Sequence, residues 1–319
     1  MSPALVQPAL IASVVALSTA MAEVLHRVRQ LARTHSPIVL VGETGTGKSF
    51  FAARLHAHSG RTGQLVDVTA GELRSELARA DIFGHERGAF TGAFARRAGL
   101  LEQAQGGTFL LDDFHLLDAD VQGALLRAVD ARRYRPLGAQ RDVPLGCGLI
   151  FGVSRDLDVL LAERNLLPDL RYRLGYSVIR LPRLAERREE IAPLAQLFLA
   201  QCAEDSGVPD GPRRFAANVL PFLEGMPYPG NLRELRARIR AAYLLARGEP
   251  ELRPTHFEGA RQDVTTYPRR GERADRLQAV KWALASTGGH VAAAARLLGV
   301  SRNTVSLLKA GRDPSSSDD

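Results

Sequence analysis

Short apolar runs alternate with helical patterns along the part of the chain that precedes Pro182. The apolar run Ile38–Val41, for example, leads through a loop into the amphipathic stretch Phe50–His58. Buried strands that alternate with helices predict an α/β fold, a parallel sheet flanked by helices on both faces. The predicted strands are Ile38–Val41, Leu65–Val68, Thr108–Leu111, Leu149–Val153 and Tyr176–Leu181.

The strand pattern ends near Pro182, and only helical patterns follow. Residues 248–273 are rich in Pro, Gly and charge and lack apolar periodicity, so they predict a linker. Before this linker the pattern predicts three helices that form an all-helical lid subdomain, namely Glu186–Glu204, Pro212–Leu223 and Gly230–Arg247. We therefore expect a short extension (1–12), an α/β subdomain (13–182), a helical lid (183–247), the linker (248–273), a small helical domain (274–311) and a disordered tail (312–319).

A glycine-rich loop follows the first predicted strand. Gly42–Ser49 has the phosphate-loop pattern G-x-x-x-x-G-K-S in the strand–loop–helix context that the motif requires. Glycines let backbone N–H groups turn toward phosphate oxygens, and the helix N-terminus adds its dipole. We expect Lys48 to reach the β- and γ-phosphates of ATP and the Ser49 hydroxyl to bind Mg²⁺. The predicted nucleotide-binding residues of this loop are Gly42, Glu43, Thr44, Gly45, Thr46, Gly47, Lys48 and Ser49.

Phosphoryl transfer also needs a carboxylate for the metal ion and a group that orients the attacking water. The apolar run Phe109–Leu111 ends in Asp112 and Asp113. Such a run is often only a strand that enters a turn. Because it lies downstream of a phosphate loop, it predicts that Asp112 is a ligand of Mg²⁺ and that Asp113 is the water-orienting base.

A family resemblance rests on the sequence between these two motifs. Gly88-Ala89-Phe90-Thr91-Gly92-Ala93 matches the GAFTGA loop of the AAA+ activators of sigma-54 RNA polymerase. Four other segments resemble motifs of the same family, namely the second nucleotide motif, the residues after the sensor strand, the connection to the lid and the sensor-II motif. These segments are Gly106–Asp112, Arg155–Leu157, Arg180–Arg187 and Tyr228–Leu235.

The resemblance implies an AAA+ P-loop ATPase that assembles as a ring, usually a hexamer, and binds ATP between subunits. Such rings push their GAFTGA loops against the sigma-54 RNA polymerase holoenzyme and open promoters. Phe90 would provide the apolar tip of an extended loop, with Gly88 and Gly92 as hinges. The implied sigma-54 contact residues are Gly88, Ala89, Phe90, Thr91, Gly92 and Ala93.

The C-terminal end carries the positive charge of the chain. Residues 260–312 hold ten Lys or Arg and three Asp or Glu, which accounts for the whole net charge of +7. This concentration predicts a polyanionic partner. The same region contains a helical stretch at Leu277–Leu284 and then a small-residue pair at Ala294 and Ala295, a turn at Gly299 and a helix cap at Ser301.

This pattern resembles the Fis-type helix-turn-helix, which implies binding to upstream enhancer DNA. Side chains in the N-terminal part of a recognition helix reach base edges, whereas later basic residues meet phosphates. The predicted base contacts are Arg302, Asn303, Thr304 and Ser306, and the predicted phosphate contacts are Lys309 and Arg312. A helical bundle used only for dimerisation is the alternative, and the local charge argues against it; family members dimerise through this unit, so both roles can hold.

Several positions around the predicted hydrolysis site differ from the family. Asp113 stands where Glu is usual, which withdraws the carboxylate by about 1.5 Å. Thr69 aligns with the Asn that pairs with this Glu, and the sensor-I Thr-Asn pair aligns with Val153 and Ser154. Leu167 aligns with the first of two arginines proposed to act across the subunit interface.

Other positions agree with the family or with the general motif. Arg173 aligns with the second interface arginine and Arg233 with the sensor-II arginine that contacts nucleotide. Ser49 replaces a Glu that many members carry, and it follows the general phosphate-loop rule. We expect ATP binding to persist and intrinsic hydrolysis to be slow, with Asp113, Arg173, Thr69 and Ser154 as the catalytic residues. A paralogous subunit in a mixed ring would compensate by supplying a better interface arginine or switch residue. The alternative is that Asp113 works through a slightly shifted water.

The interpretation is therefore an ATP-driven transcription activator. The runner-up is a DNA-bound ATP switch that assembles or represses without productive hydrolysis. A metabolic P-loop kinase or a transporter ATPase is disfavoured, because the sequence shows no substrate-pocket motif and no membrane segment. Most members of the family that the sequence resembles carry a sensory domain before the ATPase, whereas only about 12 residues precede the family-like stretch that starts at Val14, too few to fold independently. We therefore expect no N-terminal regulatory domain, and an input from expression level, a separate binding protein or a partner subunit.

The bulk composition agrees with a cytoplasmic protein. The chain has 319 residues, 45% hydrophobic and 24% charged, which is ordinary for a globular protein. No Lys or Arg precedes Arg27, so the charged start of a signal peptide is missing. Cys147 and Cys202 have no metal-ligand spacing, and we expect two buried, reduced thiols.

Overall fold

The computed structural model describes residues 18–73, 77–174, 177–206, 211–246 and 248–258, and toward the C-terminus residues 280, 284, 291–298 and 300–309. These residues belong to two compact units. One unit covers Thr19–Arg183, and the other contains Ser18 and the described residues from Leu184 onward.

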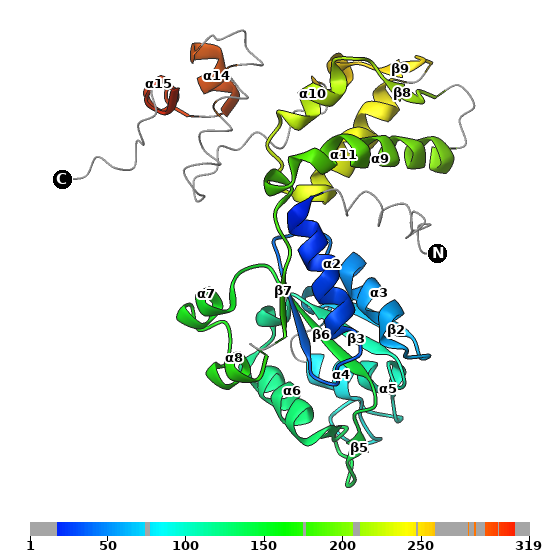
Figure 1. Ribbon diagram of the computed structural model, residues 1–319. Coiled ribbons are helices and arrows are strands. Elements are labelled where there is room, and N and C mark those ends of the chain that lie inside the picture. The colour runs from blue at the N-terminus through cyan, green and yellow to red at the C-terminus, as the bar shows by residue number, and fades with distance from the viewer. Residues whose placement is uncertain are drawn as a thin grey trace, which may run out of the picture. The chain divides into compact units, whose positions relative to one another are not determined.

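The first unit is built on a five-stranded sheet in the order β2-β3-β6-β1-β7 (Figure 1). All four pairings are parallel, with β1 between β6 and β7. The five predicted strands are all present; the first has its predicted bounds and the last is shortened. The strands are β1 (Ile38–Val41), β2 (Leu65–Thr69), β3 (Thr108–Asp112), β6 (Gly148–Val153) and β7 (Val178–Arg180).

Helices cover both faces of this sheet, which is why its central strands are continuous apolar runs. Every residue of β1 and of β6 is buried. Helices α2 and α3 lie on one side and α6 and α8 on the other (Figure 1). The helices are α2 (Thr19–Leu31), α3 (Lys48–Ser59), α4 (Ala78–Phe83), α5 (Leu100–Gln103), α6 (Ala119–Ala131), α7 (Leu157–Ala162) and α8 (Pro168–Leu174), with the short helices η1 (Ala70–Glu72) and η2 (Phe114–Leu116) and the strand pair β4 (Arg133–Tyr134) and β5 (Val143–Pro144). The predicted α/β fold is confirmed.

The strand order brings the polar ends of three strands to one edge of the sheet. The phosphate loop follows β1, Asp112 ends β3, and Ser154 follows β6. Because all strands run in the same direction, their carboxyl ends meet at this edge, where ligands of open α/β sheets bind. The edge therefore holds the candidate site.

The second unit is mainly helical, and one predicted helix in it is wrong in extent. Pro212–Leu223 contains the strand β8 (Arg214–Phe215) and a helix that starts only at Val219. Strand β8 pairs in parallel with β9 (Glu251–Leu252), so strand pairing does not stop at Pro182 as the pattern suggested. The helices are η3 (Leu184–Glu186), η4 (Arg188–Glu190), α9 (Ile191–Ser206), α10 (Val219–Glu224), α11 (Asn231–Leu245) and α12 (Pro254–Glu258).

Part of the segment expected as a linker is ordered structure, since β9 and α12 lie within 248–258. The rest of that segment lies outside the described residues, as does nearly all of the predicted helix Leu277–Leu284. Two C-terminal helices are described, α14 (Val291–Leu298) and α15 (Arg302–Lys309). Ala294 and Ala295 are buried, as expected where two helices approach closely.

Candidate nucleotide-binding site

The phosphate loop joins β1 to α3 in a conformation that only its glycines allow at low cost. Gly45 and Gly47 have φ angles of 82° and 110°. The Thr46 hydroxyl donates to the Glu43 carbonyl at 2.8 Å. A Cβ on Gly42 would lie 2.6 Å from the Thr46 hydroxyl oxygen, so no larger residue fits there. Contacts between its own residues therefore stabilise the conformation of the phosphate loop.

The ammonium group of Lys48 lies between the loop and the acidic strand end. Its Nζ donates to the Gly42 carbonyl at 3.1 Å and lies 3.4 Å from Asp112 Oδ1. Burial raises the pKa of Asp112, the Lys48 ammonium opposes this rise, and Asp113 adds to it. A Cβ on Gly152 of β6 would lie only 2.0 Å from Asp112 Oδ1. The absence of a side chain at Gly152 therefore allows Asp112 to approach Lys48.

Asp113 and Thr69 are placed next to this pair. Asp113 has φ of 52°, which Asp tolerates better than most residues, and its N–H donates to Asp112 Oδ1 at 2.9 Å. Its own Oδ1 is buried without a hydrogen-bond partner among the described residues. Thr69 is the register partner of Asp112 on the neighbouring strand. The sheet therefore brings together three of the predicted site residues.

Ser154 reaches the same edge from β6 and contacts a residue that the sequence analysis missed. Its Oγ lies 3.4 Å from Nε2 of His115 in η2. The only signal for His115 was one polar residue within the otherwise apolar run Phe114–Leu117.

Asp67 is a second missed residue. It accepts a hydrogen bond from the Ser49 side chain and lies within electrostatic range of Asp112. Desolvation beside α3 is the main cause that raises the pKa of Asp67, and the Ser49 hydrogen bond opposes it. Its signal was an acidic residue inside an apolar strand.

The donor set at this edge fits Mg²⁺, which prefers carboxylate and hydroxyl oxygens. Ser49, Asp67 and Asp112 supply such oxygens from three different elements. The buried Oδ1 of Asp113, which has no partner among the described residues, is a further oxygen at this edge that could hold a water or a cation.

The remaining predicted catalytic and nucleotide residues lie elsewhere. Arg173 of α8 is exposed and forms an ion pair with Asp130 of α6. Leu167 packs against the core of the first unit, and its N–H donates to Gln122 Oε1 at 3.1 Å. Arg233 is exposed in the first turn of α11, which belongs to the second unit.

The Gly88–Ala93 loop is a compact turn rather than the extended loop that we expected. The Gly88 N–H donates to the Ala93 carbonyl at 2.8 Å, and the Ala93 N–H donates to the Phe90 carbonyl at 3.0 Å. Gly88 and Gly92 have φ angles of 83° and 101°, so glycine is required at both.

The apolar tip is also different from the prediction. Phe90 is half-buried, with its ring 4.9 Å from the ring of His85. Phe94, which the sequence analysis did not single out, is 88% exposed. Thr91 is exposed, as expected for a contact residue.

The base of this loop is attached to the segment that follows α6 and β4. The Glu86 N–H donates to the Leu137 carbonyl at 2.9 Å, and the Leu137 N–H donates to the Gly84 carbonyl at 2.9 Å. A Cβ on Gly138 would lie 2.9 Å from Ala89 Cβ. The chain therefore runs from Asp113 through η2 and α6 directly to the support of the loop.

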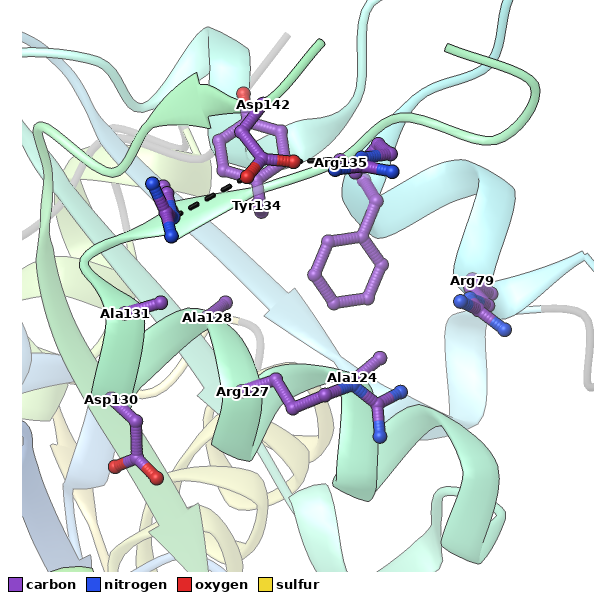
Figure 2. Close-up of a pocket in the computed structure, with 11 residues that line it drawn as sticks. Arg79, Ala124, Arg127, Ala128, Asp130, Ala131, Tyr134, Arg135 and Asp142 are labelled. Atoms are coloured by element: carbon purple, nitrogen blue, oxygen red, sulfur yellow. Dashed lines mark hydrogen bonds and ion pairs between the residues drawn. The ribbon is translucent and has the colours of Figure 1, made fainter. Parts of the chain in front are cut away.

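A cavity of about 480 Å³ lies between α4, α6 and β4 (Figure 2). Asp142 lies 2.7 Å from Nε of Arg135 and 3.3 Å from Nε of Arg133. Alanine side chains of α6 and the rings of Phe83 and Tyr134 also line the cavity. Neither the phosphate loop nor the acids at the end of β3 contribute to it, so it is separate from the candidate nucleotide site.

The second helix of the C-terminal pair begins with the predicted cap. The Thr304 N–H donates to the Ser301 hydroxyl oxygen at 3.0 Å, and the two hydroxyl oxygens lie 2.8 Å apart. Arg302 and Ser306 are exposed, and Thr304 is half-buried. The side chains of Asn303 and Lys309, and all of Gly299 and Arg312, lie outside the described residues.

Among the described residues, no helix is both long and apolar enough to span a bilayer. The thiols of Cys147 and Cys202 are both free, but only Cys147 is buried. The expectation of two buried thiols is thus wrong for Cys202, which is half-exposed near the C-terminal end of α9.

The phosphate loop after β1, the acids at the end of β3, Ser154 after β6 and the helical second unit are features of the AAA+ P-loop fold. Comparison with known families agrees. Residues 14–180 match the sigma-54 interaction domain, residues 185–270 the AAA+ ATPase lid domain, and residues 278–307 the bacterial regulatory protein Fis family. The chain therefore belongs to the sigma-54-dependent transcriptional activators.

Individual relatives support this assignment. The formate hydrogenlyase transcriptional activator FhlA of Escherichia coli is 35% identical over 309 residues, which cover 92% of this chain and 43% of FhlA. The chain thus spans less than half of that relative. The transcriptional regulatory protein ZraR of Klebsiella oxytoca is 35% identical over 98% of this chain and 71% of ZraR. The crystal structure of NtrX from Brucella abortus in complex with ATP superposes with a TM-score of 0.69 at 26% identity, and covers 92% of this chain and 68% of NtrX.

Proposed function

We propose that this protein is an ATP-driven transcription activator that binds upstream DNA and remodels the sigma-54 RNA polymerase holoenzyme to open promoters. The observation that carries the proposal is the backbone connection between the two predicted sites. The segment that starts at Asp113 and passes through α6 ends at Leu137, whose hydrogen bonds hold Gly84 and Glu86 at the base of the Gly88–Ala93 loop. A change at Asp113 can therefore be transmitted to the loop.

Each residue of the nucleotide site has a distinct role in this proposal. Lys48 and the N–H groups of the phosphate loop bind the β- and γ-phosphates of ATP. Ser49 and Asp112 would hold Mg²⁺, which would neutralise the charge that develops on the phosphate oxygens. Asp113 accepts a proton from the attacking water as the water oxygen bonds to the γ-phosphorus and the bond to the bridging oxygen breaks. Thr69 and Ser154 support this step from the neighbouring strands.

The loop supplies the contact with sigma-54. Its internal hydrogen bonds make it one turn that moves as a unit, with Thr91 exposed. The exposed ring of Phe94 adds to the proposed contact residues Gly88, Ala89, Phe90, Thr91 and Gly92, whereas the sixth predicted residue, Ala93, is buried and cannot contribute. Apolar side chains at the centre of a contact contribute most of its binding free energy.

The C-terminal helices supply the DNA contact. Arg302 stands in the first turn of α15, where the helix dipole disfavours a positive charge, so an anionic partner would relieve an unfavourable position. Arg302, Asn303, Thr304 and Ser306 are proposed to meet bases, and Lys309 and Arg312 phosphates. Because the hydroxyl of Thr304 is bonded to Ser301, we expect its contribution to be through its methyl group.

We also propose that the chain works in a ring, usually a hexamer, either with itself or with a paralogous subunit. Arg173 is exposed and paired with Asp130, so it would leave Asp130 to reach the nucleotide of a neighbour. Arg233, which stands at the sensor-II position, is proposed as a further nucleotide contact.

Intrinsic hydrolysis is proposed to be slow, since Asp113, Thr69, Ser154 and Leu167 all differ from the family. The second candidate function, a DNA-bound ATP switch without productive hydrolysis, is favoured by the same four residues. Turnover of the unmodified chain and of Asp113→Glu at saturating Mg-ATP separates the two. We expect Asp113→Glu to raise kcat, by up to about 100-fold, because a carboxylate displaced by one bond length is corrected. Ordinary turnover in the unmodified chain would refute the slow-hydrolysis proposal.

Binding to sigma-54 tests the activator proposal directly. The purified chain is mixed with sigma-54 and with ADP and aluminium fluoride, which mimic the transferring phosphate, and complexes are resolved on a native gel. We expect a complex with the unmodified chain and none with Thr91→Ala, while both proteins retain the same nucleotide affinity. Equal complex formation by both proteins would contradict the role given to the loop.

A further inference from the structure

The imidazole of His115 is the most deeply buried titratable group near the candidate hydrolysis site that has no assigned role. The residue is only 7% exposed. Its Nε2 lies 3.4 Å from Ser154 Oγ, and its Nδ1 is buried without a hydrogen-bond partner among the described residues. Burial of a polar atom without a partner is costly, so such an atom calls for an explanation.

The surroundings of His115 connect it with the hydrolysis site rather than with the core alone. It lines a cavity of about 290 Å³ together with Gln122, Arg155 and Leu167. Asp113 lies two residues before it, and the charges of Asp113 and Lys48 act on the ring. A neutral imidazole carries one hydrogen on one of its two nitrogens, and Nε2 is the nitrogen that faces the Ser154 hydroxyl.

The position of that hydrogen decides what Ser154 can do. A serine hydroxyl has a single hydrogen. If Ser154 donates to the imidazole, no hydrogen remains for a phosphate oxygen or a water. If the Nε2–H of His115 donates to Ser154 Oγ, the hydroxyl hydrogen is free to turn toward the carboxyl edge of the sheet, where the phosphate loop lies.

We propose that His115 is a positioning residue of the hydrolysis site, whose Nε2–H holds the Ser154 hydroxyl so that this hydroxyl donates to the γ-phosphate or to the attacking water. The proposal rests on the hydrolysis proposed above and assigns a new partner to Ser154. Serine is shorter than the asparagine of the family, and the imidazole fixes a group that could otherwise rotate. Gains of this kind from orientation alone are large in enzymes.

Two variants of His115 separate the role of Nε2 from that of the ring as a whole. The side-chain amide of Gln reaches about as far as Nε2 and keeps a donor toward Ser154, whereas that of Asn reaches only as far as Nδ1. We expect His115→Asn and Ser154→Ala to lower kcat by about the same factor, on the order of tenfold, and the double variant to be no worse than either one. His115→Gln should recover most of the lost turnover. The melting temperatures of the four proteins should match that of the unmodified chain, so that the changes in kcat do not reflect a loss of fold.

Multiplicative losses in the double variant, or equal losses in His115→Gln and His115→Asn, would overturn the proposal, because both results indicate a packing role. The tautomer can be measured without hydrolysis. In ¹⁵N-labelled protein, the imidazole nitrogens of His115, assigned by comparison with His115→Asn, should show the Nε2–H form, and Ser154→Ala should shift the Nε2 signal. The Nδ1–H form would overturn the proposal. If the unmodified chain does not hydrolyse ATP at all, the hydrolysis proposal fails. The tautomer measurement still tests whether the Nε2–H of His115 donates to Ser154 Oγ.

Discussion

Substitution of Gly152 by alanine is the most discriminating perturbation of the nucleotide site. The new Cβ would lie 2.0 Å from Asp112 Oδ1, whereas ordinary van der Waals contact begins at 3.4 Å. The carboxylate must therefore move by about 1.4 Å. Such a shift removes both its contact with Lys48 at 3.4 Å and its bond from the Asp113 N–H at 2.9 Å.

The expected decrease in Mg-ATP affinity follows from these lost contacts. A hydrogen bond to a charged group contributes about 1.5–3 kcal/mol. If Asp112 holds Mg-ATP in its present position, the loss of this free energy raises the Kd for Mg-ATP by about 10- to 100-fold. Isothermal titration calorimetry with Mg-ATP measures this value, and the melting temperature reports whether the fold is kept.

Gly71→Ala is the matched control for this substitution. A Cβ at Gly71 would meet nothing within 4 Å, and Gly71 is not among the glycines with positive φ. We expect this variant to bind Mg-ATP as tightly as the unmodified chain does. If Gly152→Ala also binds as tightly, Asp112 is not a ligand in the position that we describe, and the assignment of the metal site is wrong.

Three further predictions concern stability, thiol chemistry and DNA binding. Burial raises the pKa of Tyr134 to about 12, and its hydroxyl is buried without a partner among the described residues. Because the folded pKa lies above that of the unfolded chain, stability is full below pH 10 and is lost as the pH rises through about 12. Tyr134→Phe should therefore be more stable by about 1 kcal/mol at pH 7 in urea unfolding, and it should lack this alkaline loss. Burial raises the pKa of the Cys147 thiol to about 11, so a thiol reagent at pH 8 should modify Cys202 first and Cys147 only on unfolding; modification of Cys147 in the native protein would contradict its burial. In DNA titrations, Arg302→Ala should lose site preference, whereas Lys309→Ala should weaken binding to all sequences, and identical behaviour would show that the recognition helix is misplaced.

The central strands of the sheet could be predicted because they are buried on both faces. Runs such as Ile38–Val41 have no polar position that would make their bounds ambiguous, and the structure reproduces them within one or two residues. The parallel direction followed from the helices between the strands. The pair β8–β9 could not be predicted, because two-residue strands more than 30 residues apart leave no periodicity to recognise.

The candidate site could be predicted only where a motif fixes both residue type and spacing. Lys48 and Asp112 met this condition, and the structure brings them to 3.4 Å. Asp67 and His115 did not, since their importance depends on strand order and on a 3₁₀ turn that bring them next to Ser49 and Ser154. Tertiary packing, not local sequence, places these two side chains.

For the Gly88–Ala93 loop, too, the sequence motif predicted only part of the structure. The motif predicted its identity and its hinge glycines, and both glycines have positive φ. It did not predict that Phe90 packs on His85 or that Phe94 is the exposed ring. Both facts depend on backbone hydrogen bonds inside the loop, which residue types alone do not determine.

Promoter opening in a purified system tests the central claim most directly. Sigma-54 RNA polymerase holoenzyme, a promoter with an upstream binding site and the full chain are combined, and permanganate reactivity of thymines reports the melted DNA. We predict reactivity that requires both the chain and hydrolysable ATP, that is absent with a non-hydrolysable analogue and that is absent with Thr91→Ala. No melting at any concentration of ATP and chain, or equal melting with Thr91→Ala, would contradict the account.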